Sequence, residues 1–173
     1  FGKIGRAVAR RARGFGMRVL AVDPHADEQQ ASELGATITD AKTLLRESDV
    51  ISNHMNLTAE NRHFFDDAGF AAMEKHPIFL NVSRGGSVDE AALVRALDNG
   101  LIRAAGLDVL EAEKPDLENC ALIGRENVIL TPHAAFYSAR SIEALQRMSC
   151  HNLTDCLTGN RAHAFKIVNG VSI

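Results

Sequence analysis

Short apolar runs alternate along the chain with segments of helical periodicity. Five runs of strand length occur at residues 17–22, 50–51, 78–82, 104–109 and 128–130. In the first helical segment, Ile4, Val8 and Ala12 recur at the spacing of one helix face. Continuous apolar strands separated by helices are typical of a parallel sheet that is covered on both faces. The pattern therefore predicts a doubly wound, Rossmann-type α/β domain.

The predicted helices are marked by capping residues and glycines. They cover residues 3–13, 28–34, 41–47, 66–75, 87–99 and 138–157. Asp40 stands where an N-cap of the third helix is expected. Ser87 and Glu90 have the spacing of a capping box, with Ser87 as the N-cap of the fifth helix. Gly100 and Gly159 stand at the expected ends of the last two helices.

Length and pattern predict one domain with a short appendage. The 173 residues suit a single domain of ordinary size. We expect this domain to cover residues 1–159, followed by a tail at 160–173 that returns to a part of the protein outside this chain. The chain enters its first helix within five residues of Phe1, without a preceding strand. We therefore expect the first strand of the sheet to be missing from an N-terminally truncated domain.

Composition narrows the classes of partner. The formal net charge is -3 and the longest basic run is the pair Arg10-Arg11, which argues against nucleic acid as a partner. No apolar stretch approaches the roughly 20 residues that span a bilayer. The three cysteines lack C-x-x-C spacing and are interpreted as reduced thiols of a cytoplasmic protein. The histidines share no metal-ligand spacing, so no metal site is predicted.

A glycine segment and an acid together predict a dinucleotide site. Gly2-Lys3-Ile4-Gly5 matches the last four positions of G-x-G-x-x-G, in which glycines let the backbone approach a pyrophosphate at a helix N-terminus. An ordinary glycine turn would explain this segment alone. Asp23, however, ends the next strand 18 residues beyond Gly5, where a carboxylate binds ribose hydroxyls and repels a 2′-phosphate. NAD is therefore predicted rather than NADP.

Three further groups follow predicted strands. Arg84 comes after the strand at 78–82, and a guanidinium there can bind a carboxylate through two hydrogen bonds. His133 follows the last strand, where an imidazole can exchange a proton near neutral pH. Glu113 lies in the loop after the strand at 104–109 and would favour the imidazolium form if it approached His133. Ligands bind at this carboxyl edge of parallel sheets.

These segments resemble the D-isomer-specific 2-hydroxyacid dehydrogenases. The resemblance rests on Asn81–Glu90, Gly106–Glu113 and Thr131–Ala135 and extends over nearly the whole chain. It implies that Arg84 binds the substrate carboxylate and carbonyl, that His133 is the general acid/base, and that Glu113 pairs with His133. The chain has Glu113-Lys114-Pro115 where the family has Glu directly before Pro, which leaves Glu111 as an alternative partner of His133.

The resemblance also implies a set of cofactor contacts. They are Gly2, Lys3, Ile4, Gly5, Asp23, Met55, Asn56, Asn61, Val82, Ser83, Arg84, Asp108, His133 and Ala135. Asp108 is expected near the nicotinamide carboxamide, and Lys3 and Ile4 at the pyrophosphate. Asn56 departs from the family, which commonly has Pro at this position.

Two other functions stay open at this point. Thr131–Ser138, Asn61–His63 and Arg84–Gly86 are also similar to the C-terminal-binding-protein corepressors, which bind NAD(H) and act chiefly as transcriptional partners. The resemblance thus implies an NAD-dependent enzyme that interconverts 2-keto and D-2-hydroxy acids and forms a homodimer, or else an NAD(H)-sensing protein with little turnover. A relative that oxidises formate or phosphite is a third possibility. The sequence does not identify the acid.

Overall fold

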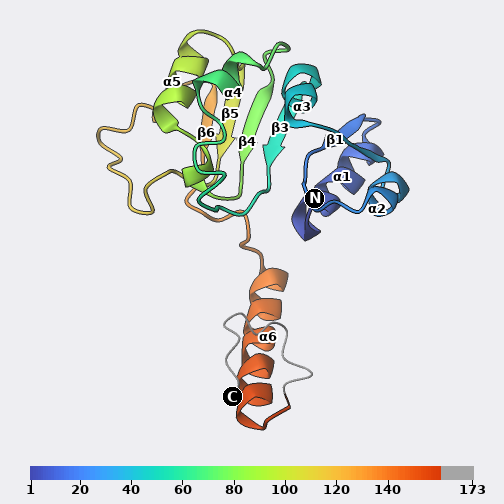
Figure 1. Cartoon of the computed structure of the whole chain (residues 1–173). Helices are drawn as coiled ribbons and strands as arrows, with labels where there is room; N and C mark the ends of the chain where they lie inside the picture. Colours follow the sequence, from blue (N-terminus) through green and yellow to red (C-terminus); the bar gives the residue numbers. More distant parts are fainter. Residues whose placement is uncertain (161–173) are drawn as a thin grey trace. The chain divides into compact units, whose positions relative to one another are not determined.

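The computed structural model describes residues 1–160 and contains two compact units. The first comprises Phe1–His133, and the second begins at Ala134 (Figure 1). The predicted tail at 160–173 lies outside the described residues except for Asn160.

The elements of the first unit alternate as the sequence pattern predicts. Their order is α1 (Lys3–Gly14), β1 (Val19–Ala21), α2 (Glu28–Glu33), β2 (Ala36–Ile38), α3 (Ala41–Glu47), β3 (Val50–Asn53), α4 (Asp67–Ala71), β4 (Ile78–Asn81), a 3-10 turn (Gly85–Ser87), α5 (Glu90–Asp98), β5 (Ala104–Leu107) and β6 (Val128–Leu130). Strand β2 was not predicted, because three residues with a central threonine are too short for a recognisable pattern. Helix α4 is shorter than predicted.

All strand pairs in the described residues are parallel. Strands β3, β4, β5 and β6 pair in that order in a four-stranded sheet, and β1 pairs with β2 in a second sheet of two strands. In the larger sheet Asn53, Asn81, Leu107 and Leu130 are partners in register across the four strands. The strands therefore end level with one another, and the turns that follow them lie along one edge (Figure 1). The predicted α/β class is confirmed.

Aromatic packing anchors the middle of the larger sheet. Phe79 of β4 is fully buried and its ring lies edge-on to Phe65, with the ring centroids 4.8 Å apart, and to Phe70 at 5.5 Å. Leu93 of α5 is buried in the same core. Such pairs add about 0.5–1.5 kcal/mol beyond the area they bury. The core therefore holds β4 firmly and with it the turn that carries Arg84.

Aspartates begin four of the helices. Asp27, Asp40, Asp66 and Asp89 each accept a hydrogen bond from the backbone N–H three residues ahead. The predicted N-cap at Asp40 is confirmed, because its side chain accepts from Thr43 N at 2.8 Å. The predicted N-cap at Ser87 is wrong. Asp89 caps α5, since Gly85–Ser87 forms a 3-10 turn of its own and buries the Ser87 side chain completely.

The second unit contains helix α6, Ala139–Leu157. Ser138 is its N-cap, and the Ser138 and Ser141 side chains form a capping box. No residue of α6 is buried, and Leu145, Leu153 and Leu157 are exposed. Among the helices of the described residues, none has the length and apolar character to cross a membrane.

Candidate functional site

The predicted catalytic residues follow adjacent strands of the larger sheet. Arg84 lies three residues after β4, Asp108 directly after β5, and His133 in the turn after β6. Because β4, β5 and β6 end in register, these turns meet at the carboxyl edge of the sheet. The topology thus brings together residues that are far apart in the sequence.

Asp108 connects the ends of three strands. It is 3% exposed, and its backbone N–H donates to the Asn81 carbonyl at 2.9 Å. The Thr131 hydroxyl donates to Asp108 Oδ1 at 2.5 Å, and the His133 N–H donates to the Asp108 carbonyl at 2.9 Å. A buried carboxylate with such donors keeps a fixed orientation. Asp108 therefore sets the position of the turn that carries His133.

His133 adopts a left-handed backbone conformation. Its φ is 52°, a value that costs energy for most residues other than glycine. The turn places an exposed imidazole at the strand end. His63 and His76 have the same conformation, so the angle describes the turn and does not identify a role for His133.

His133, Asp108 and Glu113 line one cavity of about 450 Å³. Most of the remaining lining is apolar and includes Leu117, Ile123 and Leu130. A concave site with a few polar groups among apolar walls is the usual form of a small-molecule site. The predicted pair of Glu113 and His133 therefore faces a common space.

Glu111, the alternative partner of His133, is engaged elsewhere. Its carboxylate pairs with Arg62 and, at 2.8 Å, with His63 Nε2. Its backbone N–H donates to the Glu90 carboxylate. Of the two candidate glutamates, only Glu113 lines the cavity that contains His133.

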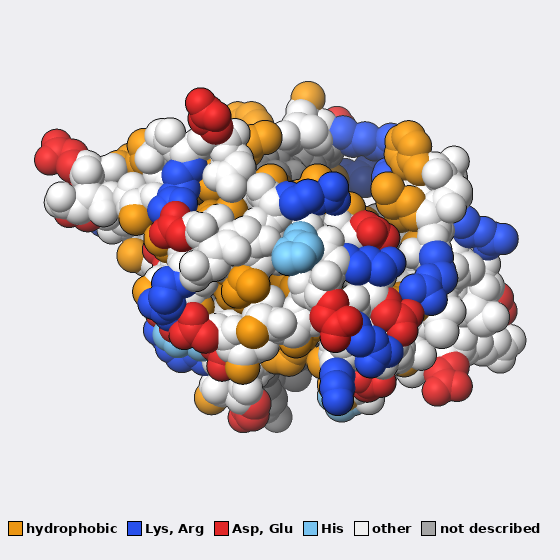
Figure 2. Space-filling model, turned by 90° about the horizontal axis from the view of Figure 1, so that it is seen from above, with side chains coloured by type: hydrophobic (Ala, Val, Ile, Leu, Met, Phe, Trp, Pro, Cys, Tyr) orange, Lys and Arg blue, Asp and Glu red, His pale blue; other side chains and the backbone are white. Residues whose placement is uncertain are grey.

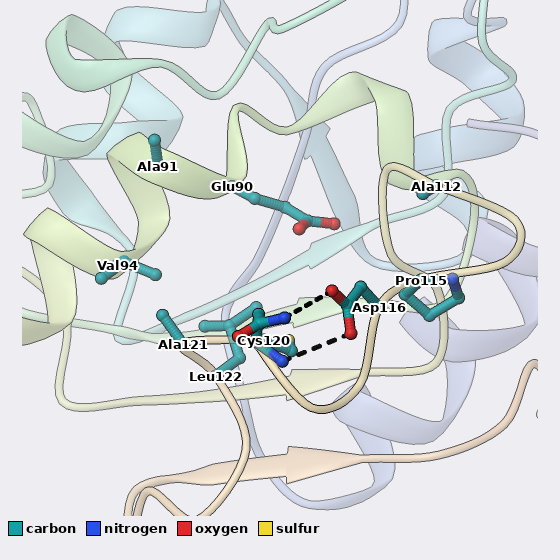
Figure 3. Close-up of a pocket in the computed structure, with 10 residues that line it drawn as sticks. Glu90, Ala91, Val94, Ala112, Pro115, Asp116, Cys120, Ala121 and Leu122 are labelled. Atoms are coloured by element: carbon teal, nitrogen blue, oxygen red, sulfur yellow. Dashed lines mark hydrogen bonds between the residues drawn. The ribbon is translucent and has the colours of Figure 1, made fainter.

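A second cavity, of about 290 Å³, lies between α5 and the segment after β5 (Figure 3). In this view Glu90 projects from α5, and Asp116 holds the opposite turn by accepting hydrogen bonds from Asn119. None of the predicted site residues lines this cavity. We therefore do not assign it to the site.

The turn after β4 is packed tightly against the turn after β5. A Cβ atom on Gly85 would lie 1.8 Å from the Leu110 carbonyl oxygen, which is backbone and cannot rotate away. The neighbouring Arg84 is exposed, and its Nη1 donates to the Ser83 carbonyl at 2.8 Å. Glycine at position 85 thus allows the turn that carries Arg84 to pack against the turn after β5, although Arg84 itself does not line the cavity of His133 and Glu113.

The glycine segment forms the start of α1. Gly2 is the N-cap residue, and no atom lies within 4 Å of a Cβ placed on it. Lys3 and Ile4 are exposed on the first turn, which contains no acidic side chain. The N–H groups at the start of a helix and the helix dipole favour an anion. The backbone nitrogen of Phe1 pairs with the Asp23 carboxylate, so the glycine segment and Asp23 lie together as predicted.

Gly5 faces the turn after β3. A Cβ on Gly5 would lie 4.0 Å from the His54 side chain, whose Nε2 is 3.0 Å from the Ser52 hydroxyl. Burial, with a smaller contribution from the amino group of Phe1, lowers the pKa of His54. The imidazole beneath the glycine segment is therefore neutral at physiological pH.

The loop after β3 is closed by its own side chains. Asn61 accepts a hydrogen bond from Thr58 N at 2.8 Å and donates to the Asn56 carbonyl at 2.7 Å. The Ser83 hydroxyl donates to the Met55 carbonyl, which ties this loop to the turn after β4. The side chain of Asn61 thus shapes the loop. Val82 is 38% exposed at the same edge, and Ala135 belongs to the second unit.

Sequence reasoning missed one buried group of polar side chains. Asn53 and Asn81 end adjacent strands, and both contact Ser87 or the turn that contains it. The sequence offered one indication of this group, because an asparagine ends each of two successive apolar strands. Within the described residues, no group of three His, Cys, Asp or Glu side chains is arranged to hold a metal ion.

Comparisons with known proteins agree with this arrangement. The sequence profile of the D-isomer specific 2-hydroxyacid dehydrogenase NAD binding domain matches residues 1–135. A D-3-phosphoglycerate dehydrogenase of Arabidopsis thaliana is 44% identical over 77% of the chain and 21% of its own length. A glyoxylate reductase of Korarchaeum cryptofilum is 43% identical over 88% of the chain and 46% of its own length. The chain therefore spans less than half of these relatives.

The fold is also that of a solved dehydrogenase. D-lactate dehydrogenase from Aquifex aeolicus, determined with NAD and lactic acid, superposes with a TM-score of 0.90 at 32% identity. The match covers 99% of this chain and 56% of that structure.

Proposed function

Because the chain belongs to the D-isomer-specific 2-hydroxyacid dehydrogenase family, as an NAD-binding domain, we propose that its protein interconverts a 2-keto acid and a D-2-hydroxy acid. The observation that carries this proposal is the set of turns after β4, β5 and β6. They bring a guanidinium, a buried carboxylate and an imidazole to one edge of the sheet.

The residues present fit the dinucleotide. The first turn of α1, with Gly2, Lys3, Ile4 and Gly5, would hold the pyrophosphate, because its N–H groups and dipole favour an anion. The Asp23 carboxylate beside this turn would bind the adenosine ribose. The remaining proposed contacts are Met55, Asn56, Asn61, Val82, Ser83, Arg84, Asp108, His133 and Ala135. When bound, NADH supplies the hydride for reduction.

Arg84 is proposed to bind the substrate carboxylate. A guanidinium presents paired N–H groups that match the two oxygens of a carboxylate, and its charge also polarises a neighbouring keto carbonyl. It thereby orients the keto carbon for reduction. The same charge stabilises the negative charge that develops on the carbonyl oxygen.

His133 is proposed to exchange the proton. In reduction, its imidazolium donates a proton to the former keto oxygen as the alcohol forms, and in oxidation the neutral ring accepts that proton. Glu113 lines the same cavity, and a carboxylate there stabilises the imidazolium charge.

The proposed partner is a small 2-keto or 2-hydroxy acid, and we propose that the protein forms a homodimer. On the face shown in Figure 2, basic and acidic side chains are interspersed rather than gathered into a stripe of one sign. That distribution does not favour direct nucleic-acid binding. All three cysteines are free, which agrees with the proposed cytoplasmic location.

A substrate panel tests the proposal. The full-length protein is mixed with NADH and a series of 2-keto acids, and the loss of NADH absorbance is followed; formate and phosphite are tested with NAD in the opposite direction. Rapid oxidation of NADH by one keto acid supports the proposal and identifies the substrate. Saturable NADH binding with no turnover of any keto acid contradicts it and favours the sensing function. Reduction of NAD by formate or phosphite alone also contradicts it.

A further inference from the structure

Two buried asparagines lie side by side at the carboxyl edge of the sheet. Asn53 ends β3 and Asn81 ends β4, and they are 3% and 1% exposed. They are partners in register, and Asn53 Nδ2 donates to Asn81 Oδ1 at 3.1 Å. Ser87, which is completely buried, accepts from the same Asn53 nitrogen at 2.7 Å. We name Asn53, Asn81 and Ser87 the strand-end network.

Asn81 closes the turn that carries Arg84. Its Nδ2 donates to the Arg84 carbonyl at 3.0 Å, and its Oδ1 accepts from the Ser83 N–H at 3.1 Å. The Ser87 hydroxyl donates to the same Arg84 carbonyl at 2.7 Å. The backbone on both sides of the Arg84 Cα is therefore held by buried side chains.

Asn53 extends the strand-end network to the loop after β3. Its Oδ1 accepts from the Met55 N–H at 3.1 Å, while the Ser83 hydroxyl donates to the Met55 carbonyl. One set of buried amides thus connects the loop proposed to contact the cofactor with the turn proposed to contact the substrate.

The chemistry of these side chains exceeds what packing requires. A buried amide that lacks hydrogen-bond partners destabilises the fold, so an apolar residue would fill the same space without that cost. The amides instead match backbone donors and acceptors of two turns. Buried networks with every member bonded confer rigidity and a single arrangement. The network therefore serves to fix the backbone conformation of the two turns.

Arg84 depends on its backbone for orientation. Within the described residues, its guanidinium donates a hydrogen bond only to the carbonyl of Ser83, its own neighbour, at 2.8 Å. Nothing beyond the turn therefore directs this side chain. We infer that Asn81 is a positioning residue that, with Asn53 and Ser87, directs Arg84 toward the substrate carboxylate; the inference rests on the proposed function of Arg84.

Asn81→Ala in the full-length protein tests this inference, with Asn127→Ala as the matched control. Asn127 also donates an amide hydrogen bond to an arginine carbonyl, that of Arg103 at 3.2 Å, but it precedes β6 at the opposite end of the sheet. We expect Asn81→Ala to lower kcat/KM for the keto acid by about 10- to 100-fold, since small misplacements of a binding group have effects of this size. The Kd for NADH should change by a smaller factor than kcat/KM, because the glycine segment and Asp23 lie outside the network, and Asn127→Ala should leave kcat/KM unchanged.

A double-mutant cycle with Arg84→Ala distinguishes an effect of Asn81 on the position of Arg84 from a loss of structure in the whole site. If Asn81 acts through Arg84, Asn81→Ala has little further effect on kcat/KM once Arg84 has been truncated. Equal effects in both backgrounds would overturn the inference and leave the proposed function intact. If Arg84→Ala alone left keto-acid turnover unchanged, the proposed role of Arg84 would fail instead.

Ser87→Ala provides a milder variant in case Asn81→Ala does not fold. It removes one of the two hydrogen bonds to the Arg84 carbonyl and keeps the other. We expect a smaller decrease in kcat/KM with the same dependence on Arg84. A folded Ser87→Ala protein with unchanged kinetics would contradict the inference.

Discussion

Single residues at the carboxyl edge of the sheet serve either chemistry or geometry. His133 is exposed and lines a cavity, where its imidazole is accessible to a ligand. Gly85 is buried against the Leu110 carbonyl and contributes only the absence of a side chain. A substitution at His133 should therefore change turnover, and a substitution at Gly85 should change the free energy of unfolding.

Replacing His133 with glutamine should affect turnover and spare cofactor binding. Glutamine keeps a polar side chain of similar reach but cannot donate and accept a proton near neutral pH. We expect kcat to fall by about 100- to 10,000-fold, the usual contribution of a general acid/base. NADH fluorescence titration should give an unchanged Kd. Loss of NADH binding with normal folding would show that the role of His133 has been misassigned.

Replacing Gly85 with alanine should destabilise the fold. The new Cβ would overlap the backbone at Leu110, so the turns after β4 and β5 must separate. Overpacking costs about 1–3 kcal/mol and occasionally more, and we expect a loss of unfolding free energy at the upper end of that range. Gly14→Ala is the control, since no atom lies within 4 Å of its Cβ position. Equal urea midpoints for the two variants would refute this packing argument.

At the scale of elements, the apolar runs predicted five of the six strands, because burial on both faces leaves a continuous apolar pattern. Helix ends were harder to predict. The cap of α5 was assigned to Ser87 because Ser-x-x-Glu matches a capping box, yet Asp89 provides the cap. Ser87 instead bonds to Asn53 of another strand, a contact that local sequence does not reveal.

In the candidate site, too, some residues could be predicted from local sequence, whereas others gain their role only in the folded structure. Arg84, Glu113 and His133 were predicted from motifs, since chemistry requires particular residue types after particular strands. The strand-end network was not predicted, because Asn53 and Asn81 gain their role only when β3 and β4 become neighbours.

Asp40 provides a test of helix capping through pH. Hydrogen bonds from the Thr43 backbone N–H and side chain lower the pKa of the Asp40 carboxyl from its ordinary value of 3.8. A lowered pKa in the folded state means that the stabilisation is present above the ordinary value and is lost as the pH falls through the lowered one. Asp40→Ala should therefore reduce the urea midpoint at neutral pH, with a smaller difference from the parent protein in strong acid.

Asp40→Asn is the matched variant for this prediction. Its amide oxygen can still accept from the Thr43 N–H but carries no charge, so the urea midpoint at neutral pH should lie between those of the parent protein and Asp40→Ala. If Asp40→Ala reduced the midpoint equally at all pH values, the charged carboxylate would not be the source of the stabilisation.

At the scale of the whole molecule, the first unit contains most of the proposed site, and the chain spans 21% to 56% of the length of the relatives compared above. The carboxyl edge contains the proposed acid/base, the proposed carboxylate-binding group and several of the proposed cofactor contacts. Relatives with similar sequences bear the names of dehydrogenases and reductases of different acids. Substrate choice is therefore a property to be measured on the full-length protein.

The stereochemistry of the product tests the central claim most directly. The full-length protein is incubated with NADH carrying deuterium at both C4 positions and with the keto acid identified in the panel, and the product is analysed by chiral chromatography and mass spectrometry. The proposed function predicts a D-2-hydroxy acid with deuterium at C2, formed in step with NADH oxidation. An L-hydroxy acid, a product without deuterium, or NADH binding without any product would contradict it.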